Sequence, residues 1–378
     1  MSGTVRVVVV GGGYAGVMAA NRAAGGTPGT APVEVVLLDP GTQFTERIRL
    51  HQVGAGGRNT AGVDWAEVLH PQVRRMQARA LSIDSGNRRI RGDHGSVRFD
   101  WLVYAVGSGE QPTALLSVTN RAAAGSTREA IAGLAPGSAV TVAGAGPTGV
   151  EVASALAVAR PDLLITIVAP SGLAHPVTGR HAVARRLQHL KISVEEGVVD
   201  PVTGTITSGG HSRPSAAATI WTAGLAVPSL ASDSGLPVDG DGRLLVDATL
   251  TVPGHERIIG AGDAVCVTGA AGAHLRASCA AAIPMGAHAA DTVLARLSGV
   301  APSAIDIGYL AQCLDLGAGR GHLQLVHPDD APRVVALSGR SAGWAKEQIC
   351  RMTVAWLARE ARRPGSFRGP TGPAVPVG

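Results

Sequence analysis

Apolar and polar positions along the chain fall into blocks that predict alternating strands and helices. Residues 4–10 form an unbroken β-branched run, short enough to be a buried strand of a parallel sheet. Residues 14–24 are rich in alanine and predict a helix. A second apolar run follows and ends at Asp39. This strand–helix–strand order predicts an α/β fold with a parallel sheet.

The same order of blocks returns in the middle of the chain. Residues 139–143 predict a strand, the residues after them a helix, and residues 163–170 a second strand. A chain of 378 residues is long enough to form two or three hydrophobic cores. We therefore expect two units of the same α/β kind.

After about residue 305 the pattern changes. The runs AQCLDLG, HLQLVHP and RVVALSG predict short strands of an antiparallel sheet, and residues 343–363 predict a helix. An apolar stripe is expected along this helix at Ala345, Ile349, Met352 and Trp356. A basic helix with tryptophan can lie on a membrane surface. The alternative is that it docks on its own domain or on the partner in a homodimer.

A glycine-rich turn connects the first predicted strand to the first helix. Gly11, Gly13 and Gly16 have the G-x-G-x-x-G spacing of a dinucleotide-binding unit. The first glycine allows the tight turn, the second lets the backbone approach a pyrophosphate, and the third lets helix and strand pack closely. Asp39 stands where such units place the acidic ligand of a ribose. A secretory signal peptide is the competing interpretation, but its cleavage would destroy this complete unit.

A second glycine turn has the same spacing. Gly144, Gly146 and Gly149 follow a predicted strand and open a predicted helix. The first N–H groups of such a helix and its dipole favour a bound diphosphate. Two complete units in one chain predict two bound nucleotides.

Composition narrows the classes of function. The formal net charge is +5, but the arginines are scattered and aromatic residues make up only 3%, so we expect no nucleic-acid partner. Lysine occurs only at Lys191 and Lys346. Neither the four cysteines nor the histidines have the spacing of a metal site, so we expect no metal. This cysteine usage predicts a reducing, cytoplasmic location, with the inner face of the membrane as a variant of it.

Three further stretches carry a family resemblance. The segment 256–265 contains a strand followed by Gly-Ala-Gly-Asp, and the stretches DWLVYAVGSG and ATIWTAGL precede it in the chain. With the two glycine turns, they resemble the pyridine nucleotide–disulfide oxidoreductase superfamily of two-dinucleotide flavoproteins, over about residues 5–300. No C-x-x-x-x-C follows the first unit. The chain is therefore most similar to the branch of type II NADH dehydrogenases and apoptosis-inducing-factor-like flavoproteins, which lacks the redox dithiol.

The resemblance implies a fold and its domain borders. The fold is α/β, with two Rossmann-like FAD/NAD(P)-binding domains, the second inserted in the first, plus a small C-terminal α+β domain. The FAD-binding domain would comprise residues 1–112 and 245–305, and the NAD(P)H-binding domain residues 113–244. Residues 306–363 would form the C-terminal cap domain, and residues 364–378 a flexible tail.

The resemblance also implies which residues bind the two cofactors. The first glycine turn would hold FAD, the second NAD(P)H, and Asp263 would bind the ribityl hydroxyls of the flavin. The residues expected to bind cofactors are Gly11, Gly13, Tyr14, Ala15, Gly16, Asp39, Arg47, Gly107, Gly144, Gly146, Pro147, Thr148, Gly149, Glu151, Gly224, Gly262, Asp263 and Ala280.

Four side chains are expected to be catalytic: Arg47, Arg49, His51 and Glu151. The first three alternate along ERIRLHQ and would share one face of an extended segment beside the flavin. There they would stabilise charge on the reduced flavin or protonate the acceptor; the alternative is surface charges paired with Glu46. Glu151 would position the nicotinamide or pass protons, or else pair with an arginine at the domain junction.

The helix predicted at 278–294 is expected to point its N-terminus at the flavin, and Pro284 is expected to kink it or break its first turn. Cys279, Ala281 and Ala282 stand where the type II dehydrogenases carry amides associated with quinone, which counts against a quinone acceptor. Cys279 is expected to be a small buried thiol.

The choice between NADH and NADPH depends on the end of the second strand in the second unit. Ala169 and Ser171 stand there, and neither is a carboxylate. Arg180, Arg185 and Arg186 follow and could meet a 2′-phosphate. The sequence therefore favours NADPH.

Taken together, these features predict an FAD-dependent NAD(P)H:acceptor oxidoreductase. A hydride would pass from NAD(P)H to flavin N5, and electrons would go on to a quinone or another small organic acceptor that enters beside RIRLHQ and the cap. One alternative is a flavoenzyme that oxidises or reduces a specialised small metabolite. Another is a flavin-based redox sensor or partner-binding protein with little turnover.

Overall fold

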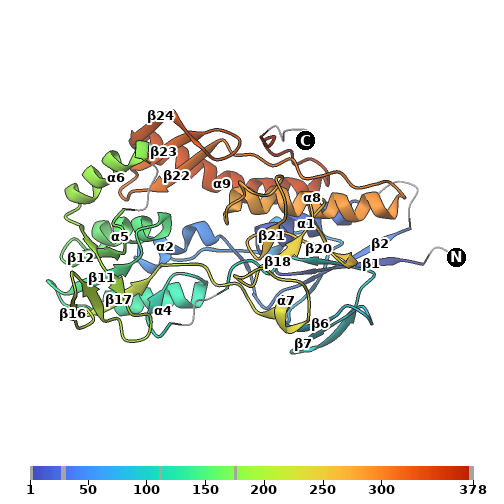
Figure 1. Cartoon of the computed structure of the whole chain (residues 1–378), viewed down its shortest axis with the longest axis horizontal. Coiled ribbons are helices and arrows are strands. Elements are labelled where there is room, and N and C mark those ends of the chain that lie inside the picture. Colours follow the sequence, from blue (N-terminus) through green and yellow to red (C-terminus); the bar gives the residue numbers. More distant parts are fainter. Residues whose placement is uncertain (1–2, 27–30, 110–112, 174–176, 374–378) are drawn as a thin grey trace.

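The computed structural model describes residues 3–26, 31–109, 113–173 and 177–373, and two parallel sheets lie at opposite ends of its long axis (Figure 1). The first sheet has the strand order β19-β20-β9-β1-β2-β5 and is parallel except for β19. Its strands are β1 (Val5–Val10), β2 (Val33–Leu38), β5 (Arg74–Met76), β9 (Trp101–Tyr104), β19 (Thr251–Val252) and β20 (His255–Gly260).

The second sheet is parallel throughout, in the order β10-β17-β11-β12-β13. Its strands are β10 (Leu116–Ser117), β11 (Ala139–Ala143), β12 (Leu164–Ala169), β13 (Ser193–Glu196) and β17 (Ala218–Trp221). The chain thus leaves the first sheet after β9 and returns to it with β19 and β20. The predicted α/β class, with one unit inserted in the other, is confirmed. The predicted domain borders stay predictions, and the border at 112 lies outside the described residues.

Smaller elements complete the two units. The short strands are β3 (Phe44–Thr45), β4 (Gly62–Val63), β6 (Ala80–Asp84), β7 (Arg89–Gly92), β8 (Gly95–Arg98), β14 (Val198–Val199), β15 (Ile206–Ser208), β16 (His211–Arg213), β18 (Leu244–Val246) and β21 (Val265–Val267). The helices before the cap are α1 (Tyr14–Ala24), the 3₁₀ helix η1 (Arg47–Arg49), α2 (Leu50–Gly54), α3 (Trp65–Val68), α4 (Arg121–Ala132), α5 (Pro147–Ala159), α6 (Val177–His189), α7 (Leu230–Asp233) and α8 (Cys279–Leu297).

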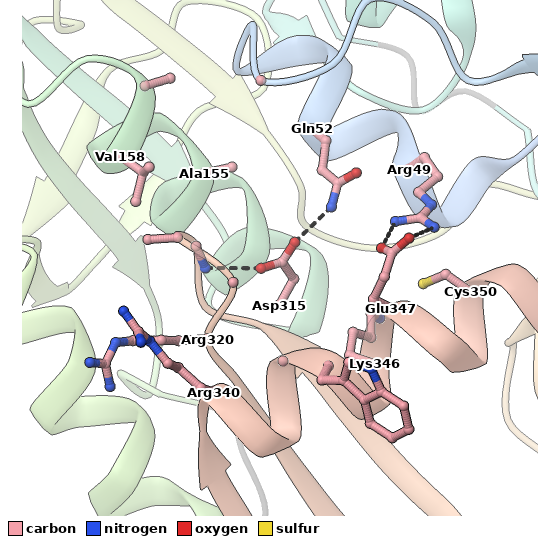
Figure 2. Close-up of a pocket in the computed structure, with 17 residues that line it drawn as sticks. Arg49, Gln52, Ala155, Val158, Asp315, Arg320, Arg340, Lys346, Glu347 and Cys350 are labelled. Atoms are coloured by element: carbon pink, nitrogen blue, oxygen red, sulfur yellow. Dashed lines mark hydrogen bonds and ion pairs between the residues drawn. The ribbon is translucent and has the colours of Figure 1, made fainter.

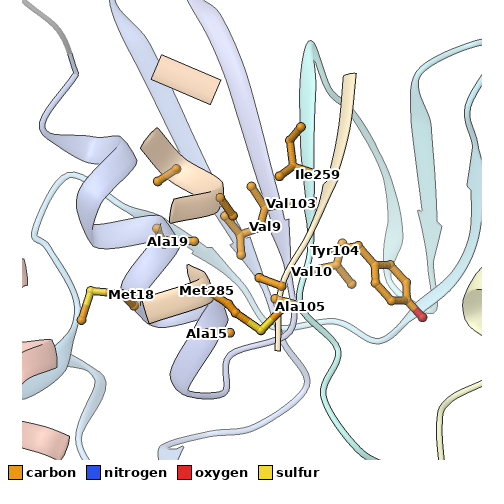
Figure 3. Close-up of a cluster of buried hydrophobic side chains, with 14 of the residues drawn as sticks. Val9, Val10, Ala15, Met18, Ala19, Val103, Tyr104, Ala105, Ile259 and Met285 are labelled. Carbon is orange, nitrogen blue, oxygen red and sulfur yellow. The ribbon is translucent and has the colours of Figure 1, made fainter. Parts of the chain in front are cut away.

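The first core lies between the first sheet and the helices α1 and α8. Figure 3 shows Val9 and Val103 of the sheet beside Ala19 of α1, with Met285 of α8 in the same cluster. Gly286 permits the close packing of the two helices, because a Cβ there would lie 2.1 Å from the carbonyl oxygen of Ala15. The helix predicted at residues 14–24 has those same bounds.

Helix α8 continues through Pro284, so the predicted break in its first turn is wrong. Proline removes the hydrogen bond to the carbonyl four residues earlier, which belongs to Ala280. Ala280 is exposed in the first turn of the helix, where water can satisfy that carbonyl.

One segment crosses between the two cores. Leu50, Val53 and Ala55 lie in sequence between β2 and β5 of the first unit, yet they are buried in the hydrophobic cluster of the second unit with Val142 and Val150. Helix α2 therefore ties the second unit to the first.

The C-terminal part has the predicted antiparallel sheet, in the order β22-β23-β24, followed by a long helix. These elements are β22 (Ala311–Asp315), β23 (Gly321–Val326), β24 (Pro332–Gly339) and α9 (Arg340–Arg362). Helix α9 contacts α1, α3 and β23, and in Figure 1 it runs alongside α1 and α8. None of the helices in the described ranges is long and apolar enough to cross a membrane.

The expected apolar stripe is not the buried face of α9. Met352 is 40% exposed and Trp356 36% exposed, whereas Thr353 and Glu360 are buried. The polar residues can face inward because each has a partner. The carboxylate of Glu360 accepts a hydrogen bond from Arg22 Nε of α1 at 2.7 Å, and burial of such groups is tolerated when they are paired.

Residues 364–373, which belong to the expected flexible tail, contact the rest of the chain. Phe367 is only 8% exposed, and the amide of Gly372 donates to Asp306 at 2.6 Å. The carbonyl of Pro370 accepts from the amide of Gly308. Residues 374–378 lie outside the described residues.

Candidate functional site

A cavity of about 260 Å³ lies at the N-terminus of α1, at the carboxyl ends of the strands of the first sheet. This edge is where open α/β sheets bind ligands. The predicted residues that line the cavity are Gly11, Gly13, Tyr14, Ala15, Asp39, Arg47, Gly107, Gly262 and Asp263. The structure thus brings together residues that are up to about 250 positions apart in the sequence.

The glycine turn has the geometry that the fingerprint requires. A Cβ on Gly16 would lie 1.8 Å from the carbonyl oxygen of Gly11, so only glycine fits there. Gly11 has a φ of +101° and no room for a side chain beside Ala105. Gly13 is the N-cap of α1 and has open space at its Cβ position. The N–H groups in the first turn of α1 therefore border the cavity. This arrangement of N–H groups fits the pyrophosphate of a dinucleotide.

Asp39 stands at the end of β2, as a ribose ligand would. Its carboxylate accepts hydrogen bonds from the amides of Gly12 at 2.6 Å and of Gly41 at 2.7 Å. Burial raises the pKa of Asp39 above its usual value, although these two amide donors oppose the rise. The two hydrogen bonds fix the carboxylate at the rim of the cavity, and each oxygen keeps a lone pair for a hydroxyl group.

Asp263 and Arg47 face each other across the same cavity. Burial raises the pKa of Asp263, and the charge of Arg47 opposes that rise. Arg47 donates to the carbonyl of Ser108 at 2.8 Å, and the amide of Ser278 at the N-cap of α8 donates to Asp263 at 3.1 Å. A second cavity of about 400 Å³ adjoins this one and shares Gly262 and Asp263 with it. The two cavities together offer the elongated space that a dinucleotide needs.

Two residues expected in the first site do not line the cavity: Gly16, which packs against Gly11, and Ala280. Ala280 is exposed in the first turn of α8, while its neighbours Cys279 and Ala282 line the cavity. Cys279 is partly buried, and burial raises the pKa of its thiol to about 11, which favours the thiol over the reactive thiolate.

The second glycine turn repeats the geometry at the carboxyl end of β11. A Cβ on Gly149 would lie 1.9 Å from the carbonyl oxygen of Gly144, and Gly144 has a φ of +113°. Gly146 is the N-cap of α5, with Pro147 and Thr148 in the first turn of the helix. Gly224, with a φ of +71°, follows the neighbouring strand β17. The turn fits a second dinucleotide for the same reason as the first.

Between the two glycine turns lies a buried cluster of charged side chains. Glu151, in the first half of α5, has its Oε2 3.7 Å from Nδ1 of His51 in α2. The other ring nitrogen of His51 lies 3.4 Å from Oδ2 of Asp315, the last residue of β22. Lys346 Nζ of α9 donates to Oε1 of Glu151 at 2.9 Å. Parts of the first unit, the second unit and the cap therefore meet in one ionic network.

Electrostatics favour the charged forms of two members of this cluster, Lys346 and Asp315. Burial opposes the charge of Lys346, but Glu151 outweighs it and the pKa of Lys346 is raised. Burial also opposes the charge of Asp315, but hydrogen bonds from His51 and Gln52 outweigh it, and its pKa is held well below the usual value. His51 follows Ile48, which lines the first cavity, by three residues, so the cluster adjoins the segment that borders that cavity.

Arg49 takes a different partner from the one expected. It forms two hydrogen bonds to the carboxylate of Glu347 in α9, drawn in Figure 2, while its Nε lies 3.7 Å from Glu46. This pairing lowers the pKa of Glu347 to about 2. The predicted extended segment is wrong, because residues 47–49 form η1 and residues 50–54 form α2. Helical geometry turns Arg47 towards the first cavity and Arg49 towards α9.

A third cavity, of about 630 Å³, opens between α2, α5 and the cap. Figure 2 shows its walls: Arg49 and Gln52 on one side, Ala155 and Val158 of α5 on another, and Lys346 and Glu347 of α9 opposite. It leads from the exposed arginines Arg320 and Arg340 to Asp315 of the charged cluster.

Sequence reasoning missed Asp315, Lys346 and Glu347. They lie in the cap, more than 260 residues after His51, and no local spacing relates them to it. One feature of the sequence could have drawn attention to Lys346. It is one of only two lysines, and all the other residues in the Lys and Arg total are arginines.

Fold and site together define a class: an oxidoreductase with two dinucleotide-binding units, one inserted in the other. The chain belongs to the pyridine nucleotide-disulphide oxidoreductase family, which it matches over residues 5–291. Membership implies FAD and a nicotinamide nucleotide as cofactors, and the two glycine turns described above fit them.

Known relatives agree with this assignment. Two NADH dehydrogenase-like proteins, from two strains of Mycobacterium tuberculosis, are each 30% identical to the chain over 380 residues, covering 91% of it and 92% of the relative. Two solved structures share the fold. Sulfide:quinone oxidoreductase of Aquifex aeolicus has a TM-score of 0.79 at 17% identity, covering 96% of this chain and 93% of that one. NDH2 of Plasmodium falciparum in complex with NADH has a TM-score of 0.77 at 14% identity, covering 96% and 99%.

Proposed function

We propose that the protein is an FAD-dependent NAD(P)H:acceptor oxidoreductase whose acceptor is a quinone or another small organic molecule. The observation that carries the proposal is the position of Glu151. It follows the second glycine turn by two residues and lies in one ionic network with His51, three residues after Ile48 of the first cavity. The two nucleotide sites therefore converge on one buried cluster of charged groups.

The bound cofactors would supply the redox chemistry, transfer of a hydride from NAD(P)H to flavin N5 and of electrons onwards to the acceptor. The protein would bind and orient them. The first turn of α1 and Asp39 would hold FAD, and Arg47 would place a positive charge where negative charge develops. The second turn, with Gly144, Gly146, Pro147, Thr148 and Gly149, would hold NAD(P)H.

The charged cluster would handle the protons of acceptor reduction. Lys346 Nζ carries a proton beside Glu151, and His51 lies between Glu151 and Asp315. Such a chain of carboxylate, imidazole and ammonium groups can deliver a proton and take one up from water. The 630 Å³ cavity joins this cluster to solvent next to residues 49–52 and α9, which is where an acceptor is expected to enter.

The identity of the acceptor is open to experiment. Cys279 and Ala282 line the first cavity, so amides of the kind associated with quinone in type II dehydrogenases are absent from these two positions. A small polar acceptor is therefore a strong competitor to a quinone.

Anaerobic mixing tests the proposal. The purified protein should carry flavin, and NADH or NADPH should bleach the flavin absorbance within seconds. Quinones and polar small acceptors are then compared for their rates of reoxidation. Glu151→Gln should slow the reoxidation by the acceptor at least about tenfold, while Glu129→Gln, an exposed glutamate of α4, should not. Protein that takes up no flavin, or flavin that neither nucleotide reduces, would contradict the proposal.

A further inference from the structure

At the carboxyl edge of the second sheet, a glutamate of β13 lies beside the end of β12. The residues that end β12 supply no carboxylate themselves. Ala169 ends β12 and Glu196 ends β13, and the two residues are partners in the parallel register. Both therefore stand at the carboxyl edge of the sheet. In a dinucleotide-binding unit, the end of the second strand is where an acidic residue binds the adenosine ribose.

Two hydrogen bonds fix the backbone at Glu196 beside that strand end, and the space above Gly172 shows where its carboxylate lies. The amide of Gly197 donates to the carbonyl of Ala169 at 3.1 Å. The hydroxyl of Ser208 donates to the carbonyl of Glu196 at 2.7 Å. A Cβ on Gly172, in the turn after β12, would lie 4.0 Å from Oε1 of Glu196. The carboxylate thus lies across the turn that follows the second strand.

The charge of Glu196 is available to a ligand. The residue is exposed, and within the described ranges no ion pair involves it. Its neighbour Glu195 differs, because both of its carboxylate oxygens accept hydrogen bonds from Arg213, at 2.5 and 2.6 Å. Successive side chains of a strand point to opposite faces, so the two glutamates have separate surroundings.

The arginines that favoured NADPH are less suited to a 2′-phosphate than the sequence suggested. Arg186 donates to the carbonyls of Leu316 and Gly317, at 3.0 and 3.2 Å, and so faces the cap. Arg180 and Arg185 are exposed on α6. By contrast, Glu196 is the register partner of Ala169 at the end of β12.

We propose that Glu196 replaces the missing carboxylate of the second unit and binds the ribose hydroxyls of the adenosine, so that this site prefers NADH to NADPH. The inference rests on the proposed function, since it assumes that the second glycine turn binds a nicotinamide nucleotide. A carboxylate accepts hydrogen bonds from both ribose hydroxyls of NADH, whereas it repels the 2′-phosphate of NADPH. The preference is the reverse of the one read from the sequence alone.

Calorimetric titration of the flavin-loaded protein with NAD⁺ and with NADP⁺ tests the assignment without turnover. The wild-type protein should bind NAD⁺ at least about tenfold more tightly, a difference of about 1.4 kcal/mol. Glu196→Gln removes the charge and keeps the shape, and it should reduce the preference about tenfold. The matched control is Glu195→Gln, which should leave the ratio of the two affinities unchanged.

Each outcome decides a different point. A wild-type preference for NADP⁺, or an equal change of the ratio in the two variants, overturns the role of Glu196 and leaves the proposed function standing. If neither nucleotide binds the flavin-loaded protein, the proposed function fails and this assignment fails with it.

Discussion

His51 Nε2 lies 3.4 Å from Oδ2 of Asp315, a residue 264 positions later in the chain. The contact joins α2 to the last residue of β22, and Gln52 donates to the same oxygen at 2.8 Å. Because the cluster is buried, its charges are as important for stability as for chemistry.

Replacing Asp315 by asparagine should destabilise the protein by about 1.5–3 kcal/mol at neutral pH, the range for a hydrogen bond to a charged group. The pKa of Asp315 is lower in the folded protein than in the unfolded chain. Its stabilising effect is therefore complete above pH about 4 and is lost as the pH falls through the folded-state pKa. The gap between wild type and variant should narrow below pH about 4.

Urea unfolding at several pH values measures that gap. Asp241→Asn, a 79% exposed carboxylate beside Arg243, is the control and should change stability by less than about 0.5 kcal/mol. An Asp315→Asn penalty that does not vary with pH would show that the aspartate is not held ionised by its neighbours.

The pair of Lys346 and Glu151 should behave as a buried ion pair. Their side chains are 13% and 11% exposed. Lys346→Met leaves Glu151 without its cation and should cost about 3–5 kcal/mol. Adding Glu151→Gln should restore part of that loss, because the buried charge is then gone. A double-mutant cycle by chemical denaturation measures the coupling; additive losses would argue against a direct pair.

The two glycine turns can be tested separately. Gly16→Ala should abolish flavin retention, because its Cβ would lie 1.8 Å from a carbonyl oxygen. Gly149→Ala, with 1.9 Å at the equivalent place, should weaken nicotinamide nucleotide binding and leave the flavin bound. Flavin content by absorbance and nucleotide affinity by titration are the two readouts.

Gly125→Ala is the matched control for both glycine variants. Gly125 lies inside α4 with open space at its Cβ position, and alanine there should be neutral or stabilise by about 0.5–1 kcal/mol. Loss of flavin from Gly149→Ala, as complete as from Gly16→Ala, would mean that the turns are not independent sites.

Arg22 and Glu360 should account for much of the docking of α9. Their side chains are 7% and 0% exposed, and Glu360 also accepts from the amides of Gly365 and Phe367. Arg22→Met should cost about 3–5 kcal/mol and should expose residues 364–373 to protease.

The more exposed pair of Arg243 and Asp239 provides the control, since Arg243→Met should cost about 1 kcal/mol or less. Unchanged proteolysis in Arg22→Met would show that this pair does not hold the segment.

The sequence predicted well those features that depend on the backbone nearby. The turn at Gly11–Gly16 and the helix after it could be foreseen, because steric limits on glycine and helix propensity act over a few residues. The antiparallel strands of the cap followed from short apolar runs. The order of the family motifs along the chain then predicted the inserted architecture.

Features that depend on distant partners could not be foreseen. Arg49 was expected beside the flavin, but its partner is Glu347 of α9, which no spacing relates to it. The face of α9 that is buried carries Lys346, Thr353 and Glu360, because polar partners from other elements compensate their burial. The apolar stripe alone therefore predicted the wrong face of α9 to be buried.

The contact of Arg22 with Glu360 spans 338 positions, which has a consequence for how the molecule is made. The ribosome releases α1 and its nucleotide turn long before the two counter-charges of Arg22, which are Asp291 of α8 and Glu360 of α9. We therefore expect the turn at Gly11–Gly16 to reach its final structure only after α9 has been translated. A nascent chain arrested before α9 should fail to retain flavin, although the glycines and aspartates that line the first cavity have already been synthesised.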